Sequence, residues 1–363
     1  MKWIISVLFV FAVLVGCTKK TNVIQIGVAG PMTGDQSVFG QDEAHGVELA
    51  VKEWNEKGGI LGKKIIAVVE DDQHDPRQAV AVANRLVDDG VVGVIGHFNS
   101  NCSIPASVVY HKAGISMISH GSTNPQLTEQ GFNNVFRVCG RDDQQGRIAA
   151  QFVTNKLKLT RIAVIDDRTT YGQGLTDQFK KWLGKACKVV YSSSIIQGDK
   201  DFRAVLTDIK AADPQLIYYG GVYPEGGLLV NQARQLGINA LFMGGDGIMG
   251  PEFIKIAGSS ANGVYATFGP DITRFKQAKG FIKSYKRLYG DPGPYSIYAY
   301  IAANILLGSI SAAGTTNSRA IINYMHTHSF DTALGPIRFD NKGDVVHSPY
   351  VIWQVKDGRF VQL

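Results

Sequence analysis

Hydroxyl-bearing side chains occur directly after two apolar runs, and their spacing indicates a site for an anion. Ser100 follows the run Val91–Gly96, and Ser122 and Thr123 follow the run Ile115–Ser119. Buried runs of this length predict parallel strands, whose following loops and helix N-termini meet at one edge of the sheet. Free N–H and O–H donors at such an edge bind a carboxylate. Capping and turn formation are the alternative roles for any one of these hydroxyls.

The whole chain alternates apolar runs with amphipathic segments, which predicts an α/β fold with mainly parallel sheets flanked by helices. One helix is predicted at Glu43–Lys57, and a second begins with Asp75 as N-cap before Pro76 and ends at Gly90. The other predicted strands are Val23–Ala29, Ile65–Val69, Arg161–Ile165, Cys187–Tyr191, Leu216–Tyr219, Ala240–Met243 and Val264–Thr267. The last hundred residues predict helices and closing strands at Phe275–Leu288, Tyr295–Ala313, Ser318–His326, Ile337–Phe339 and Val351–Val355.

The alternation restarts near Gly140, which predicts two lobes with a cleft between them. We assign residues 23–140 and 270–336 to an N-terminal lobe, and residues 141–269 and 337–363 to a C-terminal lobe. The chain then crosses between lobes three times, near Gly140, Gly269 and Gly335. Multiple crossings favour closure about a hinge over independent motion of the lobes.

The N-terminus has the pattern of a signal peptide. Lys2 precedes the apolar run Trp3–Val15, which is too short to span a bilayer, and residues 1–16 end directly before Cys17. The ending LVGC resembles the lipobox of bacterial lipoproteins, which implies a lipid on Cys17 and a tether at residues 17–22. An ordinary soluble secreted protein is the alternative. No later segment is predicted to be long and apolar enough to cross a membrane.

Composition excludes several classes of function. The formal net charge is +6 and becomes +5 without Lys2, and no block of basic residues occurs, so nucleic acid is not expected as a partner. No metal-binding or cofactor motif stands out, so neither a metal nor a cofactor is expected. Without Cys17 as a thiol, Cys102, Cys139 and Cys187 allow at most one disulfide, and the sequence does not say whether any two of them pair.

Nearly the whole mature chain resembles one family in collinear order. The matching motifs are GVAGPMTGDQSVFGQDEAHGVELAVKEWNEKGGILGKKI at 27–65, the block at 70–128, RIAVIDDRTTYGQGL at 161–175, DFRAVLTDIKAADPQLIYYGGVYPE at 201–225, QARQLGINALFMGGDG at 232–247 and LGPIRFDNKGDV at 334–345. They resemble the periplasmic branched-chain amino acid binding proteins, the leucine/isoleucine/valine receptors of ABC transporters. The resemblance implies the two-lobed type I periplasmic binding fold, no enzymatic activity, and hinge closure on an aliphatic amino acid. It also implies a lipid-anchored monomer outside the cytoplasmic membrane that delivers its ligand to ABC permease subunits.

The resemblance implies which residues hold each end of the amino acid. The positions that match the family's carboxylate site are Ser100, Gly121 and Thr123, with Ser122 in the same loop. The positions that match its ammonium site are Tyr171 and Asp246 on the other lobe. A zwitterion that leaves water needs donors at one end and a negative charge at the other, so this division is physically reasonable.

The wall around the ligand side chain departs from the family pattern. Phe39, Phe98, Asn99 and Tyr295 are predicted side-chain contacts, with burial in the core as the alternative for the three aromatic residues. The family often has a disulfide at the positions of His74 and Asn99, a glutamate at Asp246 and a tyrosine at Val222. A different neutral or aromatic amino acid, a small amide or a urea therefore stays open as the ligand.

Two other functions and one other site compete with this interpretation. The chain could be a sensor that reports to a signalling partner, or a hydrolase of a small amide with Ser122 as nucleophile. Gly245, Gly247 and Gly250 spell G-x-G-x-x-G, the pattern of a dinucleotide site. The short segment Pro251–Ala257 that follows and its late place in the chain argue against a dinucleotide.

Overall fold

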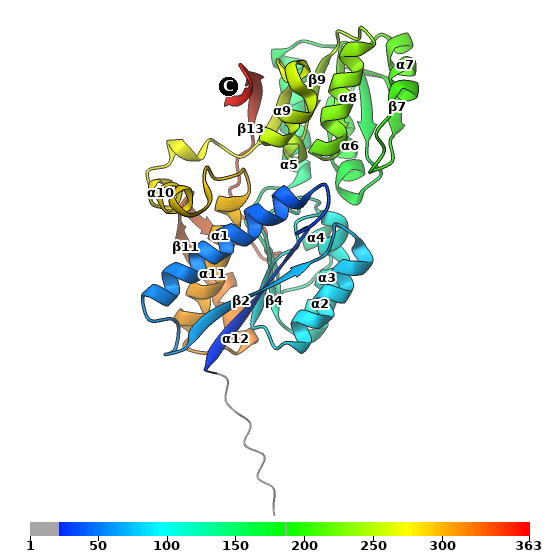
Figure 1. The fold of residues 1–363 in the computed structure, drawn as a ribbon. Coiled ribbons are helices and arrows are strands. Elements are labelled where there is room, and N and C mark those ends of the chain that lie inside the picture. The colour runs from blue at the N-terminus through cyan, green and yellow to red at the C-terminus, as the bar shows by residue number, and fades with distance from the viewer. Residues whose placement is uncertain (1–21, 186) are drawn as a thin grey trace, which may run out of the picture.

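The computed structural model describes residues 22–185 and 187–363. The predicted signal peptide, the lipidation site Cys17 and the tether up to residue 21 lie outside the described residues. The described chain forms two lobes stacked on one another, each built on its own sheet (Figure 1). The predicted division into two α/β lobes is thus present.

The sheet of the N-terminal lobe has five parallel strands. Their order is β2 (Lys64–Asp71), β1 (Val23–Gly30), β3 (Gly93–Gly96), β4 (Ser116–Ser119) and β5 (Val135–Arg137). Strand β5 was not predicted, because three residues are too few for a recognisable pattern. Strand β2 lies on one side of β1, and β3 and β4 lie on the other side. The chain therefore leaves β1 and β3 in opposite directions along the sheet, and ligand-binding loops are expected at the carboxyl ends of these two strands.

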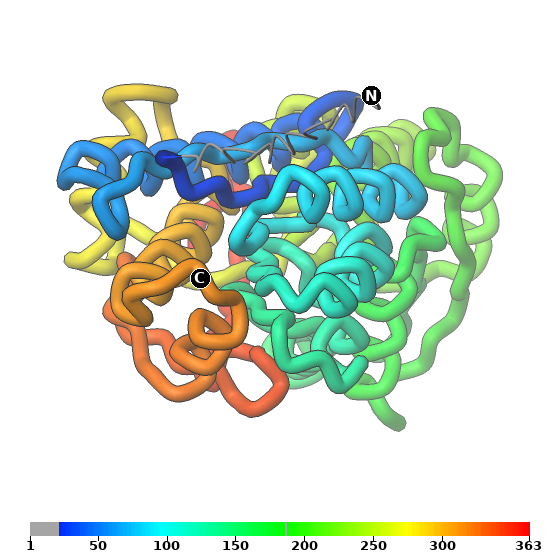
Figure 2. The backbone as a smooth tube through the Cα atoms, turned by 90° about the horizontal axis from the view of Figure 1, so that it is seen from below, coloured from blue at the N-terminus to red at the C-terminus, as the bar shows by residue number. Residues whose placement is uncertain are grey.

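Helices cover both faces of this sheet. One face is covered by α1 (Ser37–Glu56) and α11 (Ser296–Ala313), and the other by α2 (Pro76–Asp88) and α3 (Ser100–Ala113). Strand β1 explains this layering, because Ile24, Ile26 and Val28 alternate with residues that face the other way, such as Ala29. Seen from below, the late helices α11 and α12 (Ser318–Thr327) lie beside the N-terminal segments (Figure 2).

Helix α11 differs from one expectation. It has 18 residues and a mean hydropathy of 1.4, so by length and composition alone it could cross a membrane. However, 67% of its residues are buried inside the protein, where it packs on α1, β3 and β4. A helix that is apolar on all sides is typical of the interior of a large lobe, and α11 is such a core helix.

The sheet of the C-terminal lobe has seven strands. Their order is β14 (Arg359–Gln362), β13 (Val351–Lys356), β10 (Tyr265–Phe268), β9 (Leu241–Gly244), β8 (Leu216–Gly220), β6 (Arg161–Asp166) and β7 (Lys188–Ser194). Only the two C-terminal strands β13 and β14 run antiparallel to their neighbours. The lobe's main helices are α5 (Asp142–Gln151), α6 (Thr170–Leu183), α7 (Arg203–Ala212), α8 (Tyr223–Gln235) and α9 (Pro251–Ala257).

The third crossing lies later in the chain than the sequence suggested. Residues 329–338 form a hairpin of β11 (Ser329–Thr332) and β12 (Gly335–Arg338). The next segment stays with the first sheet, where Arg137 N donates to Gly343 O at 3.0 Å. The chain enters the second sheet only at Val351. Residues 337–345 therefore lie with the N-terminal lobe, whereas we had assigned them to the C-terminal lobe, because a three-residue apolar run does not reveal which sheet it joins.

Local signals in the sequence located helix ends well. The Asp75 carboxylate caps α2 by accepting from Arg77 N and Gln78 N, and Gly90 has the positive φ of 72° that favours glycine after a helix. Helix α1, however, begins six residues before its predicted start at Glu43, because its first turn carries no recognisable cap.

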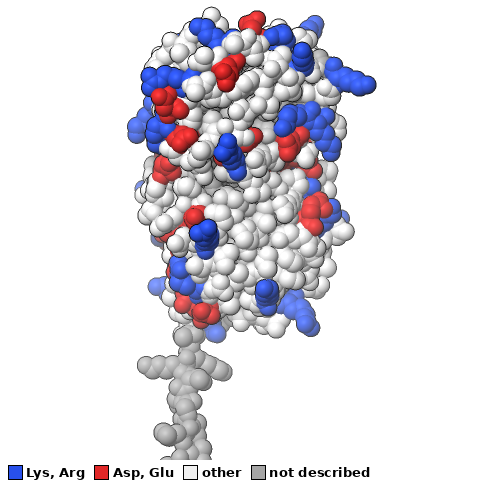
Figure 3. All heavy atoms as spheres, turned by 90° about the vertical axis from the view of Figure 1, so that its right-hand side faces the viewer, with Lys and Arg blue, Asp and Glu red and all other residues white. Residues whose placement is uncertain are grey.

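The structure also shows the state of three cysteines and the distribution of surface charge. Cys102, Cys139 and Cys187 are all buried and free. Basic and acidic side chains are interspersed on the face shown in Figure 3. The residues that the structure describes include no cluster of metal-binding side chains.

Candidate functional site

A narrow cavity with a free volume of about 20 Å³ lies between the lobes, at the carboxyl ends of the strands. Residues from both lobes line it: Phe98, Asn99, Ser100, Asn101, Gly121 and Tyr295 from the N-terminal lobe, and Asp167, Thr169, Tyr171, Gln197, Val222, Asp246 and Gly247 from the C-terminal lobe. Segments separated by up to two hundred residues thus meet here.

One end of the cavity is organised around the carboxylate of Asp246. Its Oδ1 accepts from Tyr171 Oη at 2.8 Å and from Gln145 Nε2 at 2.9 Å, while its Oδ2 accepts from Tyr295 Oη at 3.2 Å. Gln145 is itself fixed, because its Oε1 accepts from Asp246 N and from Thr267 Oγ1 at 2.7 and 2.6 Å. The carboxylate is therefore held in one orientation before any ligand arrives.

The charge of this end suits a cation. Asp246 is only 4% exposed, and burial raises the pKa of its carboxyl group, whereas the hydrogen bonds from Gln145 and Tyr171 lower it. Among the described residues that line the cavity there is no Lys, Arg or His. The negative charge of Asp246 thus has no basic partner within the cavity, and a ligand ammonium would supply one.

The glycines around Asp246 have a packing role. Gly247 N donates to Tyr171 Oη at 3.0 Å, and a Cβ on Gly247 would lie 2.6 Å from Gly221 O. A Cβ on Gly245 would lie 2.5 Å from Tyr171 Oη. The glycines of the G-x-G-x-x-G sequence therefore allow Tyr171 to approach Asp246 closely. The helix α9 that follows them is short, with seven residues.

The other end of the cavity is formed by the N-terminus of α3. Asn99 occupies the N-cap position but makes no capping hydrogen bond with its side chain. Ser100 Oγ, at the start of the helix, accepts from Asn124 N at a long 3.3 Å. The first N–H groups of an α-helix have no partner within the helix, so an uncapped N-terminus in a cavity can bind a carboxylate.

The loop after β4 supplies a second group at this end, but not all of its hydroxyls. Gly121 lines the cavity, and Thr123 is fully buried with an Oγ1 that has no hydrogen-bond partner. Ser122 instead turns inward, where its Oγ donates to Phe98 O at 2.8 Å. The structure thus brings Ser100 and Gly121 to the cavity. Thr123 is not among the residues that line it, and Ser122 has a structural partner.

Aromatic rings form one wall of the cavity. Phe98 stacks on Phe39 with ring centroids 4.4 Å apart and meets the edge of Tyr295 at 4.7 Å. Phe39 lies behind Phe98 and does not line the cavity, although it was predicted to contact the ligand. It instead supports the Phe98 ring. Packing of this kind fixes the position of the wall.

The lobes are joined across the cavity by direct hydrogen bonds. Tyr295 Oη donates to Asp246 O at 3.0 Å, Asn124 Nδ2 donates to Thr170 O at 2.8 Å, and Tyr223 Oη donates to Asp35 O. These bonds join loops of opposite lobes, so the structure has the closed arrangement of the cleft.

The sequence missed several residues of this site. Gln145 lies 101 positions before Asp246 in a helix that shows no unusual pattern. Asp167, Thr169 and Gln197 also line the cavity and were not predicted. Only the place of Asp167, directly after strand β6, was a usable signal, because loops at the carboxyl ends of parallel strands commonly line ligand sites.

Asp42 supports the wall from behind and makes the stability of the protein depend on pH. It is buried, accepts from Tyr295 N at 3.2 Å, and burial raises its pKa from 3.8 to about 7. Between these values the folded protein keeps a proton that the unfolded chain has lost, so the contribution of Asp42 to stability falls as pH rises from 4 to 7. Urea titrations of the wild type and the variant Asp42→Asn measure this contribution. The unfolding free energy of the wild type minus that of the variant should fall as the pH rises from 4 to 7, and it should be constant above pH 7. A difference that stays constant from pH 4 to 8 would contradict this role of Asp42.

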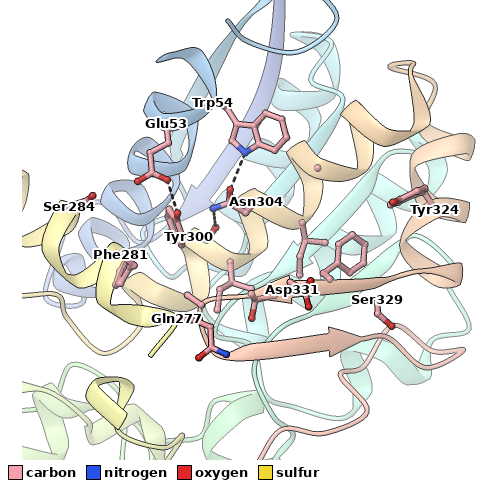
Figure 4. Close-up of a pocket in the computed structure, with 17 residues that line it drawn as sticks. Glu53, Trp54, Gln277, Phe281, Ser284, Tyr300, Asn304, Tyr324, Ser329 and Asp331 are labelled. Atoms are coloured by element: carbon pink, nitrogen blue, oxygen red, sulfur yellow. Dashed lines mark hydrogen bonds between the residues drawn. The ribbon is translucent and has the colours of Figure 1, made fainter. Parts of the chain in front are cut away.

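A larger groove of about 630 Å³ lies on the outside of the N-terminal lobe, between α1, α10 (Ala278–Tyr289), α11 and the β11–β12 hairpin (Figure 4). Its central polar groups bind one another: Tyr300 Oη donates to Glu53 Oε2 at 2.6 Å, and Trp54 Nε1 donates to Asn304 Oδ1 at 3.0 Å. None of the buried polar atoms that lack a partner lies among its lining residues in the described chain. The inter-lobe cavity is therefore the stronger candidate for a specific small-molecule site.

Comparison with known proteins gives consistent matches over the described fold. A family profile described as periplasmic binding protein matches residues 23–359. The Leu/Ile/Val-binding protein homolog 1 of Brucella abortus (strain 2308) is 42% identical over 337 residues, which cover 92% of this chain and 91% of that protein.

Solved structures agree with the sequence matches. The leucine binding protein LivK from Thermotoga maritima MSB8 superposes with a TM-score of 0.86 at 32% identity, over 94% of this chain and 97% of that one. The branched-chain amino acid transporter substrate binding protein LivJ from Streptococcus pneumoniae, solved in complex with isoleucine, has a TM-score of 0.86 at 29% identity, over 94% of this chain and 100% of that one.

Proposed function

The chain belongs to the periplasmic binding protein family, and from this premise we propose that it is the amino acid receptor of an ABC importer. The proposed ligand is a neutral, aliphatic amino acid of the branched-chain type, bound in the cavity between the lobes. The observation that carries the proposal is the buried, pre-oriented carboxylate of Asp246, which faces a cavity whose opposite end is the uncapped N-terminus of α3.

The two ends fit the two charges of an amino acid. The ligand ammonium would bind Asp246 Oδ2 and the oxygen of Tyr171 in the C-terminal lobe. The ligand carboxylate would bind the N–H groups at the start of α3, Ser100 Oγ and Thr123 Oγ1 in the N-terminal lobe. Since each lobe holds one end, the ligand binds the closed form better than the open form, which couples occupancy to closure. Permease subunits that recognise the closed form would then receive loaded receptor.

This proposal is tested by a thermal-shift and calorimetry screen of the purified protein against the twenty amino acids and against small amides and ureas. A ligand at a hundredfold excess over its Kd should stabilise the folded protein by about 2.7 kcal/mol. Stabilisation by neutral aliphatic amino acids is expected. If no amino acid stabilises the protein while an amide or urea does, the assignment of an amino acid site is wrong.

The Phe98 ring offers an apolar wall that the ligand side chain would contact. A Cβ on Gly121 would lie 2.5 Å from Phe98 Cδ2, and Phe39 and Tyr295 hold the ring from two other sides. The variant Phe98→Ala should therefore lower the ratio of leucine affinity to alanine affinity by about tenfold, because leucine loses apolar contact that alanine does not make and one methylene in an apolar pocket is worth about 1–3 kcal/mol. Competition calorimetry with the two amino acids measures this ratio. The variant Phe132→Ala, at a ring that stacks on His111 and does not line the cavity, should leave the ratio unchanged. An unchanged ratio in Phe98→Ala would remove Phe98 from the wall.

The family places the protein in the periplasm, and we propose that a lipid on Cys17 anchors it to a membrane. The proposal is supported by the sequence LVGC before the mature chain. The variant Cys17→Ser should move the protein from the detergent phase to the aqueous phase when cell extracts are partitioned. Equal partitioning of both forms would show that the protein is not lipidated.

A further inference from the structure

Tyr223 belongs to the C-terminal lobe, but its ring and its hydroxyl both contact the N-terminal lobe. It begins α8, and its ring meets the ring of Phe39 edge-on, with centroids 5.0 Å apart. Its Oη donates to Asp35 O. Phe39 belongs to α1 and Asp35 to the loop before this helix, so both partners lie on the other lobe. Tyr223 is only 4% exposed, so its side chain is shielded from water in the closed arrangement.

These contacts involve no group that would touch the ligand. Neither Tyr223 nor Phe39 is among the described residues that line the cavity, although Val222 next to Tyr223 is. Phe39 instead stacks on Phe98, so Tyr223 supports the apolar wall from behind. The contacts of Tyr223 therefore join the two lobes without a ligand atom between them.

Closure of the lobes makes the contacts of Tyr223, and opening breaks them. The three crossings between the lobes contain neither Tyr223 nor Asp35, so a rotation about the crossings separates these two residues. In the open form, the hydroxyl of Tyr223 and the carbonyl of Asp35 would bind water instead of each other, and the Tyr223 ring would lose its contact with Phe39. Tyr223 thus stabilises the closed form relative to the open form.

The charged side chains at the same place contribute less to closure. Lys200 Nζ of the C-terminal lobe lies 3.9 Å from Asp35 Oδ2, and the two side chains are 65% and 41% exposed. His74 Nε2 lies 3.3 Å from Asp35 Oδ1, but His74 belongs to the same lobe as Asp35. Because an ion pair between exposed side chains is worth little in water, the buried side chain of Tyr223 is the main contact between the lobes here.

We propose that Tyr223 acts as a latch, a positioning residue that stabilises the closed form without touching the ligand and so determines how long a bound ligand stays. The proposal rests on the amino acid site described under the proposed function and adds a residue that controls release from it. Because the contacts form only after the lobes close, they slow dissociation and leave association unchanged. Because they touch no ligand atom, they stabilise the complexes of different amino acids by the same factor.

The variant Tyr223→Phe tests the latch, since it removes the hydroxyl and keeps the ring. Stopped-flow measurements with leucine and isoleucine, or with the two amino acids that stabilise the wild type most, give both rate constants for each amino acid. We expect the dissociation rate constant to rise about tenfold for both, because the hydrogen bond to Asp35 O is lost, while the association rate constant stays the same. Dissociation as slow as in the wild type, or a change for only one amino acid, overturns the latch while the amino acid site stands. If the wild type binds no amino acid, the proposed function has failed and the latch with it.

Unfolding in urea separates a latch from a residue that merely stabilises the fold. Without ligand the lobes can open, so the unfolding free energy of ligand-free Tyr223→Phe should equal that of the wild type, and a difference should appear only at saturating ligand. An equal loss with and without ligand would overturn the latch. The matched control is Tyr191→Phe, because the hydroxyl of Tyr191 donates to Asp208 Oδ2 at 3.3 Å within the C-terminal lobe. Ligands should dissociate from this control variant as they do from the wild type.

Discussion

Replacing Asp246 with alanine should weaken binding of the amino acid ligand by about 2–5 kcal/mol, because the ligand ammonium would then be buried without its counter-charge. The carboxylate is 4% exposed and is held by hydrogen bonds from Tyr171, Gln145 and Tyr295. Isothermal titration calorimetry of the wild type and the variant measures the loss directly. The variant Asp208→Ala, at an exposed carboxylate of the same lobe, should bind as the wild type does.

The same residue predicts how binding depends on pH. Burial raises the pKa of Asp246, and a proton on its carboxyl group competes with the ligand ammonium. The affinity of the wild type should therefore fall as the pH is lowered through the pKa of the unliganded site, and the affinity of Asp246→Ala should fall less over the same range. Wild-type affinity in Asp246→Ala at a pH above this range, where the carboxylate is ionised, would show that Asp246 does not bind the ammonium.

Removing the carboxylate of Asp344 should lower the unfolding free energy by about 3–5 kcal/mol, because it would leave the fully buried guanidinium of Arg137 without a counter-charge. Arg137 Nε and Arg141 Nη1 each lie 2.6 Å from an oxygen of Asp344, and Thr128 Oγ1 donates to the same carboxylate. Arg137 also donates to Ser122 O and Asn124 O at 2.9 and 3.0 Å, in the loop that lines the carboxylate end of the cavity. Ligand affinity should therefore fall together with stability in Asp344→Ala.

Urea denaturation and calorimetry test this expectation on three variants. Asp344→Asn keeps the shape and part of the hydrogen bonding without the charge, so its stability should lie between those of the wild type and Asp344→Ala. Asp291→Ala breaks the exposed ion pair with Lys286 and should leave stability unchanged within error. If Asp344→Ala is no less stable than Asp291→Ala, the buried ion pair does not support this part of the protein.

The positions that the sequence placed in the site were those that directly follow a strand or begin a helix. Ser100 and Tyr171 lie at helix starts after β3 and β6, and Asp246 lies two residues after the end of β9. The strand pattern indicated Ser100, whereas the resemblance to a family indicated Tyr171 and Asp246. The same reasoning could not tell that Gly121 lines the cavity while Ser122 and Thr123 do not, since only packing decides which residues of a loop face the cavity.

The sequence by itself determined the α/β class, the two lobes, most strands, the helix caps and, through its resemblance to a family, the residues at the charged ends of the cavity. These follow from short-range physics, because hydrophobic periodicity, capping and turn formation act within a few residues. Only the tertiary structure decided that Gln145 orients Asp246, that Gln36 pairs with Asn99, and that residues 337–345 stay with the first lobe. Each of these depends on a contact between segments that are 63 or more positions apart, and the pattern on either segment contains no information about its partner.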